Sequence, residues 1–199
     1  SNASRGLGDV YKRQIQLHFL FLIINLLFQY QLLSFIPHSI FICYSTNIMR
    51  IRQLVFVAKE RDELAQQICN LFELKETFND PGIIHFGLEN VLIPLNDTFI
   101  EIVTPVQENT TAERFLDKRG GDGGYMVILD VDDFEDEKKR VEDENISIVW
   151  NADRKEEDIH ARAIHLHPKE TGGAILSLDK MIPEDAWLWA GTNWRKDIS

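Results

Sequence analysis

The stretch IHLHPKETGGAILSLDK, residues 164–180, contains the pattern that decides the fold. His165 and His167 alternate with apolar residues, which is typical of a strand with one polar face. Pro168 and the glycine pair after it indicate a turn. The next apolar run carries Ser177 at its centre. The pattern predicts a hairpin of two strands, the second of which places one small polar residue among apolar neighbours.

The elements before this hairpin repeat an order that is found earlier in the chain. In the first copy, residues 51–58 favour a strand, and residues 60–74 carry one apolar stripe at helical spacing. In the second copy, residues 124–131 favour a strand, and Asp132 or Asp133 caps the helix that follows. Three short strand candidates complete each copy: IIHFGLE (83–89), VLIPL (91–95) and TFIEIVTPV (98–106), then ISIVW (146–150), ARAIHLH (161–167) and GGAILSL (172–178). Such a repeat predicts two similar modules that cannot each bury a core alone.

Net charge and cysteine content exclude several classes of function. The 199-residue chain has a formal net charge of −11 at pH 7. This acidity argues against nucleic-acid binding, because phosphate neutralisation by Lys and Arg supplies most of that affinity. The two cysteines, Cys43 and Cys69, form neither a disulfide framework nor a zinc ribbon, and they suit a reducing compartment. We therefore expect a cytoplasmic protein that binds no nucleic acid.

The first 48 residues differ in composition from the rest, and residues 15–48 contain no Asp, Glu, Lys or Arg. Three interpretations are open. A membrane anchor needs about 20 apolar residues, and the run 19–28 is shorter. A signal peptide needs a cleavage site of small residues, and none follows cleanly. We favour the third, a non-native leader with translated flanking sequence, because SRGLGDVYKRQ resembles an adapter-like leader. The native domain is then expected to begin at Met49, without a membrane segment.

The paired βαβββ order resembles the vicinal oxygen chelate superfamily, the glyoxalase and bleomycin-resistance fold. The segment HPKETGGAILSL is similar to the last-strand motif of methylmalonyl-CoA epimerases, and other stretches look like uncharacterised glyoxalase-like proteins. The resemblance implies an α+β fold in which two βαβββ modules form a curved, cup-like mixed sheet. It places the modules at 49–110 and 124–181, followed by a Trp-rich tail at 182–199. It also implies a homodimer that binds a small molecule.

The same resemblance implies where a metal would bind. In the superfamily, one ligand stands on the first strand and one on the last strand of each module. These positions fall on Gln53, Glu101, Met126 and Ser177. Only Glu101 is a strong ligand for a hard or borderline divalent ion, and the thioether of Met126 suits a soft ion. We therefore expect no metal or other cofactor. The alternative is a displaced divalent site formed by Glu101 with His165 and His167.

Glu101 is the principal catalytic candidate. Phe99 and Val103 share its strand face, so its carboxyl group is expected among apolar side chains. Burial would raise its pKa towards the range of a useful acid or base. The competing interpretation is a glutamate on an edge strand that points to solvent.

Two functional hypotheses follow from different classes. In the first, the protein is a lyase or isomerase for a small carboxylate or acyl thioester, with Glu101 as acid/base. In the second, it is a metal-free protein that binds or sequesters a small molecule. The predicted substrate contacts are Gln53, Met126, Ser177, His165, His167 and Lys169. The alternative for His165 and His167 is that they are polar residues at the rim of the cup. The alternative for Lys169 is a solvated lysine in the turn. The tail tryptophans are expected to pack on the sheet and close one side of the cavity, with a lid or dimer contact as the alternative.

Overall fold

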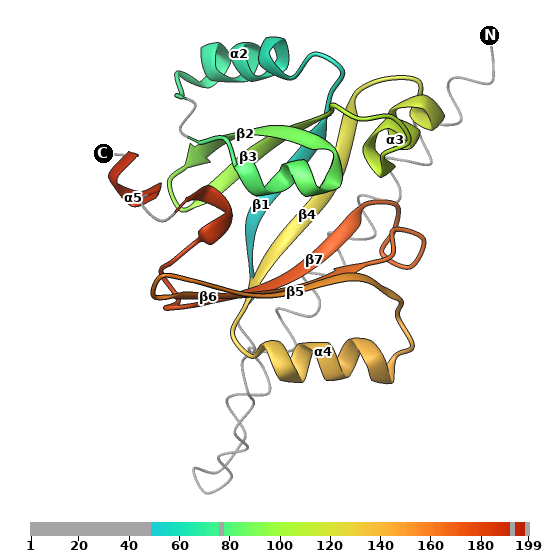
Figure 1. Cartoon of the computed structure of the whole chain (residues 1–199), viewed down its shortest axis with the longest axis vertical. Coiled ribbons are helices and arrows are strands. Elements are labelled where there is room, and N and C mark those ends of the chain that lie inside the picture. The colour runs from blue at the N-terminus through green and yellow to red at the C-terminus, as the bar shows by residue number, and fades with distance from the viewer. Residues whose placement is uncertain (1–48, 76–77, 192–193, 198–199) are drawn as a thin grey trace, which may run out of the picture. The chain divides into compact units, whose positions relative to one another are not determined.

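The computed structural model describes residues 49–75, 78–191 and 194–197 (Figure 1), so the expectations for residues 1–48 lie outside it. Within these ranges, seven strands form one sheet in the order β2-β3-β1-β4-β7-β6-β5. The strands are β1 (Met49–Val57), β2 (Leu88–Leu95), β3 (Thr98–Pro105), β4 (Gly123–Val131), β5 (Ile148–Glu156), β6 (Ile159–Leu166) and β7 (Ile175–Ile182). The helices are α2 (Arg61–Phe72), η1 (Pro81–Phe86), α3 (Thr111–Arg119), α4 (Phe134–Asp143), η2 (Leu188–Ala190) and α5 (Trp194–Asp197). In these ranges, no helix is both long and apolar enough to cross a membrane.

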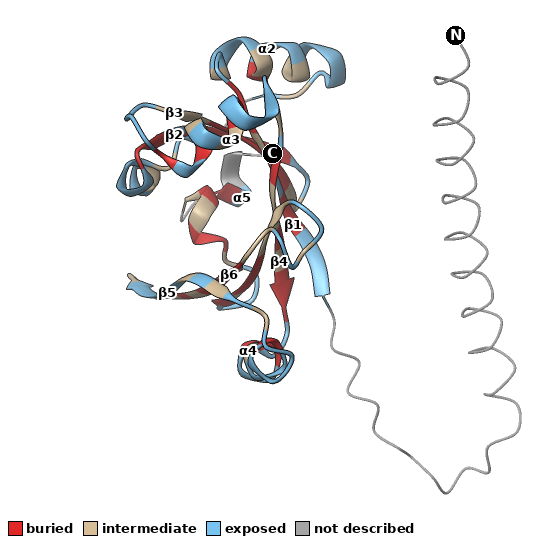
Figure 2. Ribbon diagram, turned by 90° about the vertical axis from the view of Figure 1, so that its right-hand side faces the viewer, coloured by how far each residue is buried: buried red, intermediate tan, exposed pale blue. Residues whose placement is uncertain are grey.

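The two halves of the sheet have the same internal pairing. β1 pairs with β3 in parallel, β4 pairs with β7 in parallel, and β1 and β4 pair antiparallel at the centre. The equivalence extends to single residues, because Val55 stands opposite Glu101 and Ile128 stands opposite Ser177. The sheet curls so that its two halves face each other (Figure 2). The predicted α+β class and cup-like sheet are confirmed.

One predicted strand of the first module is not present. Residues 81–86 form the short helix η1, and the chain enters β2 only at Leu88. The Asp80 side chain accepts a hydrogen bond of 2.8 Å from the Gly82 N–H, and proline is favoured at the first helical position. Only an isolated bridge between Phe78 and Leu92 remains beside β2 in this module. The apolar run alone could not reveal this, because short apolar runs do not distinguish strand from helix.

The alternation of side chains along the strands produces two distinct faces. On the convex face, α2 covers Ile93 and Ile102, while residues around α4 cover Val131 and Leu178. Side chains on the opposite face form the largest core cluster, together with residues of the tail. This cluster contains Val55, Val57, Leu88, Leu92, Phe99, Val103, Ala112, Leu116, Tyr125, Ile128, Ala161, Met181, Trp187, Leu188, Ala190 and Trp194. The core therefore lies inside the cup.

Asp133, one of the two predicted caps, begins α4. Its side chain accepts hydrogen bonds from the N–H groups of Glu135 and Asp136 at 3.1 and 3.0 Å. Replacing Asp133 by alanine should lower the free energy of unfolding by about 1 kcal/mol, because two N–H groups lose their acceptor. Urea denaturation measures this loss. The matched variant Asp133→Asn keeps a capping oxygen and should stay near wild type; an equal loss in both variants would argue against capping.

Candidate functional site

The concave face brings the predicted positions to the inside of the cup. Gln53 and Ser177 are buried almost completely, Glu101 is 6% exposed, and Met126 is half-buried against the core cluster. Strand alternation explains this placement. In β7, Ser177 lies on the same face as Met181, which is a core residue four positions further along the strand. All four positions therefore belong to the inner side of one sheet.

Glu101 lies at the centre of a hydrogen-bond chain. The Asn90 side-chain amide donates to its Oε1 at 2.6 Å, and the Gln53 amide donates to its Oε2 at 2.7 Å. Burial raises the pKa of Glu101 from 4.5 to about 7, although both amide donors act in the opposite direction. The carboxyl group can therefore exist in either protonation state near neutral pH, which an acid/base group requires.

Both amides are fixed in orientation by a second partner. The backbone N–H of Asp80 donates to the Asn90 side-chain oxygen at 2.8 Å, and the Trp187 indole N–H donates to the Gln53 side-chain oxygen. Each amide thus accepts on its oxygen and donates through its nitrogen to Glu101. The chain of hydrogen bonds links η1, three strands and the tail, and it allows each amide only one orientation.

A second buried carboxyl group, that of Asp179, lies in the other module. The Ser177 hydroxyl donates to its Oδ1, and the Trp189 indole N–H donates to its Oδ2 at 2.6 Å. Burial raises the pKa of Asp179 from 3.8 to about 7. The sequence analysis missed both Asp179 and Asn90. The two-residue period was the available signal, because it puts Asp179 on the same face as Ser177.

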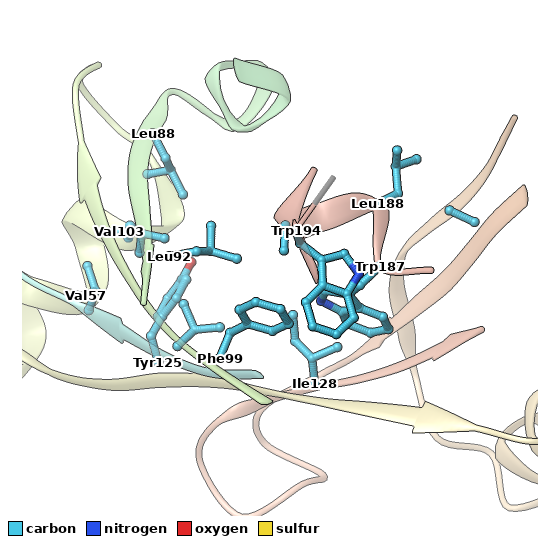
Figure 3. Packing of buried hydrophobic residues seen from close by; sticks show 14 of the residues in the cluster. Val57, Leu88, Leu92, Phe99, Val103, Tyr125, Ile128, Trp187, Leu188 and Trp194 are labelled. Atoms are coloured by element: carbon cyan, nitrogen blue, oxygen red, sulfur yellow. The ribbon is translucent and has the colours of Figure 1, made fainter. Parts of the chain in front are cut away.

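The tail lies inside the cup. Trp187 is fully buried and Trp194 is 5% exposed, and both pack with Phe99 and Ile128 of the sheet (Figure 3). The helical segments η2 and α5 lie between the two halves of the sheet (Figure 2). Two tail indoles also donate to polar groups of the cup, as described above. The expectation that the tail packs on its own sheet agrees with this arrangement.

Comparisons with known proteins agree with this geometry. No family model matches the chain. Over 98 residues, the chain is 28% identical to the mitochondrial methylmalonyl-CoA epimerase of Dictyostelium discoideum; the match covers 49% of this chain and 58% of that enzyme. The chain thus spans little more than half the length of the curated relative that it matches.

Solved structures of such enzymes share the fold. The methylmalonyl-CoA epimerase of Mycobacterium tuberculosis superposes with a TM-score of 0.56 at 20% identity, covering 65% of this chain and 86% of that one. An epimerase in complex with methylmalonyl-CoA gives a TM-score of 0.58 at 16% identity, covering 67% and 94%. The chain has the vicinal oxygen chelate fold. The similarity to methylmalonyl-CoA epimerases that the HPKETGGAILSL segment led us to expect is confirmed.

Among the residues predicted as substrate contacts in the second module, His165 stands opposite Ser177 in the β6–β7 pair. His165, on β6, packs its ring against Trp150 with 4.3 Å between centroids, and burial lowers its pKa to about 4. Its imidazole is therefore neutral at pH 7. His167 Nδ1 accepts a hydrogen bond of 3.1 Å from the Lys169 backbone N–H, and the Lys169 side chain is exposed. The His-Pro-Lys turn is thus a locally bonded turn whose lysine faces solvent.

The residues at the metal positions of the vicinal oxygen chelate fold do not suit a divalent ion. Both oxygens of Glu101 already accept hydrogen bonds, and the side-chain oxygen of Gln53 accepts one from Trp187. Met126 offers only a soft thioether. Across the described ranges, no three His, Cys, Asp or Glu side chains group closely enough to hold a metal ion. The alternative site of Glu101, His165 and His167 is therefore not assembled in the described residues.

An open cleft lies near Glu101. It has a volume of about 510 Å³ and lies between η1 and β2. Its lining includes Asp80, Ile83, Leu88 and Asn90. Because Asn90 donates directly to Glu101, this cleft comes within one side chain of the buried carboxyl group.

Proposed function

We propose that the chain binds an acyl thioester in its cup and transfers a proton at the carbon next to the thioester carbonyl, as an isomerase does. The observation that carries this proposal is Glu101, a buried carboxyl group with a pKa of about 7. General acid–base catalysis is most effective when the pKa lies near the working pH. The similarity to methylmalonyl-CoA epimerases supports acyl-CoA compounds as the substrate class to test.

In the proposed reaction, the Glu101 carboxylate accepts the proton from carbon. The electron pair of the C–H bond moves into the carbonyl group and gives an enolate. The carboxylic acid then returns a proton to the same carbon, and inversion of the centre requires that the enolate first turn its opposite face towards Glu101. Asn90 and Gln53 act as positioning residues, because they hold the carboxylate through its two oxygens. The predicted substrate contacts are Gln53, Met126, Ser177, His165, His167 and Lys169.

Replacing Glu101 by glutamine should abolish this proton transfer. Methylmalonyl-CoA is incubated with the protein in D₂O, and deuterium at its exchangeable carbon is measured by mass spectrometry. Wild type should exchange the proton faster than buffer, while Glu101→Gln falls by roughly 100-fold or more, the usual contribution of a general base. Glu142→Gln is the matched control, because Glu142 is exposed on α4 and pairs with Lys138. Exchange at the wild-type rate in Glu101→Gln would exclude Glu101 as the base.

A second variant tests the same role without removing the carboxyl group. Asn90→Leu deletes one hydrogen-bond donor to Glu101, a donor that lowers the pKa of that group. The pH profile of exchange should therefore move to higher pH. An unmoved profile with normal folding would show that Glu101 does not set the rate.

A metal-free binding or sequestration protein is the second candidate. Two observations favour it: the tail fills the cup, and the metal positions lack a suitable ligand set. Saturable binding of the acyl-CoA with no deuterium exchange in wild type would support this candidate over the isomerase. A homodimer and a cytoplasmic location stay predictions under either candidate.

A further inference from the structure

Arg52 is a buried cation without a hydrogen-bond acceptor. Its side chain is fully buried, and its three guanidinium nitrogens have no hydrogen-bond partner among the described residues. The closest carboxylate oxygen recorded for it, Asp97 Oδ2, lies 3.9 Å from one nitrogen and already accepts from Arg50 at 2.8 Å. An unsatisfied buried charge is costly, so such a group calls for a partner that is not yet present.

A bulge in β1 turns Arg52 into the cup. Ile51 pairs with Leu129 and Gln53 pairs with Ile128. Because Leu129 and Ile128 are consecutive in β4, Arg52 is an extra residue in β1 without a partner in the ladder. Arg52 and Gln53 are adjacent in sequence, yet both contact the tail inside the cup. The guanidinium group therefore lies next to the Glu101 hydrogen-bond chain.

Aromatic rings of the tail now cover this cation. The guanidinium carbon lies 4.8 Å from the ring centroid of Trp187, 5.0 Å from that of Trp194 and 5.9 Å from that of Phe99. Figure 3 shows these three rings together on the inner side of the sheet. Ring faces attract a cation but offer no hydrogen-bond acceptors for its five N–H groups. A carboxylate would satisfy two of them in a fork geometry.

We propose that Arg52 is the anion-binding group of the cup, and that a small organic carboxylate binds it by displacing the ring of Trp194. The inference rests on the proposed function for the location of the ligand in the cup. Ligand and tail compete for one surface, so the apparent affinity is reduced by the fraction of molecules whose tail is displaced.

The tail tryptophans report on their own displacement. The chain has four tryptophans, and three of them, Trp187, Trp189 and Trp194, belong to the tail. Malonate is titrated into the full chain at constant ionic strength while tryptophan emission is recorded, with neutral malonamide as the matched control ligand. Malonate should produce a saturable red shift, and malonamide should not. A missing malonate shift, or an equal shift with malonamide, would overturn the proposal.

Three variants test the partners in this competition. Arg52→Met should weaken malonate binding by roughly tenfold or more. Arg119→Met, with the same loss of charge at an exposed position of α3, should bind as wild type does. Trp194→Ala should bind malonate more tightly than wild type, an outcome that a purely structural role for Arg52 does not produce. Circular dichroism confirms folding in each case. Wild-type affinity in Arg52→Met, or unchanged affinity in Trp194→Ala, would refute the assignment.

Failure of the anion site and failure of the proposed function can be distinguished by experiment. Deuterium exchange that depends on Glu101, with malonate binding that ignores Arg52, would remove only the anion site. Malonate binding that depends on Arg52, without exchange in wild type, would remove only the isomerase activity.

Discussion

Replacing Trp187 by alanine is expected to lower the free energy of unfolding by about 3–5 kcal/mol, the usual cost of deleting a large buried aromatic side chain. Trp187 is fully buried in the principal core cluster, and its ring faces Arg52. The variant also leaves the Gln53 side-chain oxygen without its donor. Urea denaturation followed by circular dichroism measures the loss.

Two further substitutions separate the contributions to this effect. Trp187→Phe keeps a benzene ring in the core but removes the pyrrole ring with its N–H. It should therefore lose less than Trp187→Ala, and the loss should include about 1–3 kcal/mol for the unsatisfied buried acceptor. Ile182→Ala removes an apolar side chain that is 54% exposed at the start of the tail, and it should change stability little. A loss in Trp187→Ala no greater than in Ile182→Ala would mean that the tail is not part of the core.

Stability is expected to depend on pH through the two buried carboxyl groups. The pKa of Glu101 and the pKa of Asp179 rise on folding, each to about 7, because burial disfavours the charged form. Between the ordinary values near 4 and about 7, the folded state binds more protons than the unfolded state. Stability is therefore greatest below the ordinary values and falls as pH rises through this window, by roughly 3 kcal/mol for Glu101 and roughly 4 kcal/mol for Asp179.

His165 acts in the opposite direction over much of the same window. Burial lowers its pKa from 6.5 to about 4, so the unfolded state binds the extra proton there, and stability rises with pH. The free energy of unfolding of wild type should thus still fall as pH rises, but His165 offsets part of the fall caused by the two carboxyl groups. Asp179→Asn should flatten this fall, because Asn cannot titrate and the Ser177 hydroxyl can rotate to accept from its amide.

A histidine variant gives the converse result. His165→Asn should make the free energy of unfolding fall more steeply with pH, because it removes the histidine whose titration acts against the two carboxyl groups. Urea denaturation at several pH values from about 4 to about 7 measures all three slopes. Identical slopes in wild type and Asp179→Asn would show that Asp179 titrates as an exposed carboxyl group does.

Much of the sheet followed from the sequence. Residues 124–131 and 172–178 were predicted as strands, and the structure has β4 at Gly123–Val131 and β7 at Ile175–Ile182. The repeat predicted the paired modules, because each strand needs a partner to cover its apolar side. Glu101 was placed on the inner face from its apolar neighbours Phe99 and Val103, both core residues. These features depend on patterns within a few residues, and such patterns are visible in one chain.

What only the tertiary structure decided depends on register and long-range packing. The Asn90–Glu101–Gln53 chain joins three strands, and Gln53 and Glu101 are 48 positions apart. A shift of one residue would turn any of these side chains to the other face. The bulge that turns Arg52 inward is a mismatch between two strands, and neither strand sequence alone encodes it. The sequence by itself determined the cup and its central carboxyl group; the folded chain decided that its own tryptophans fill that cup, because their burial depends on surfaces that exist only after the sheet has formed.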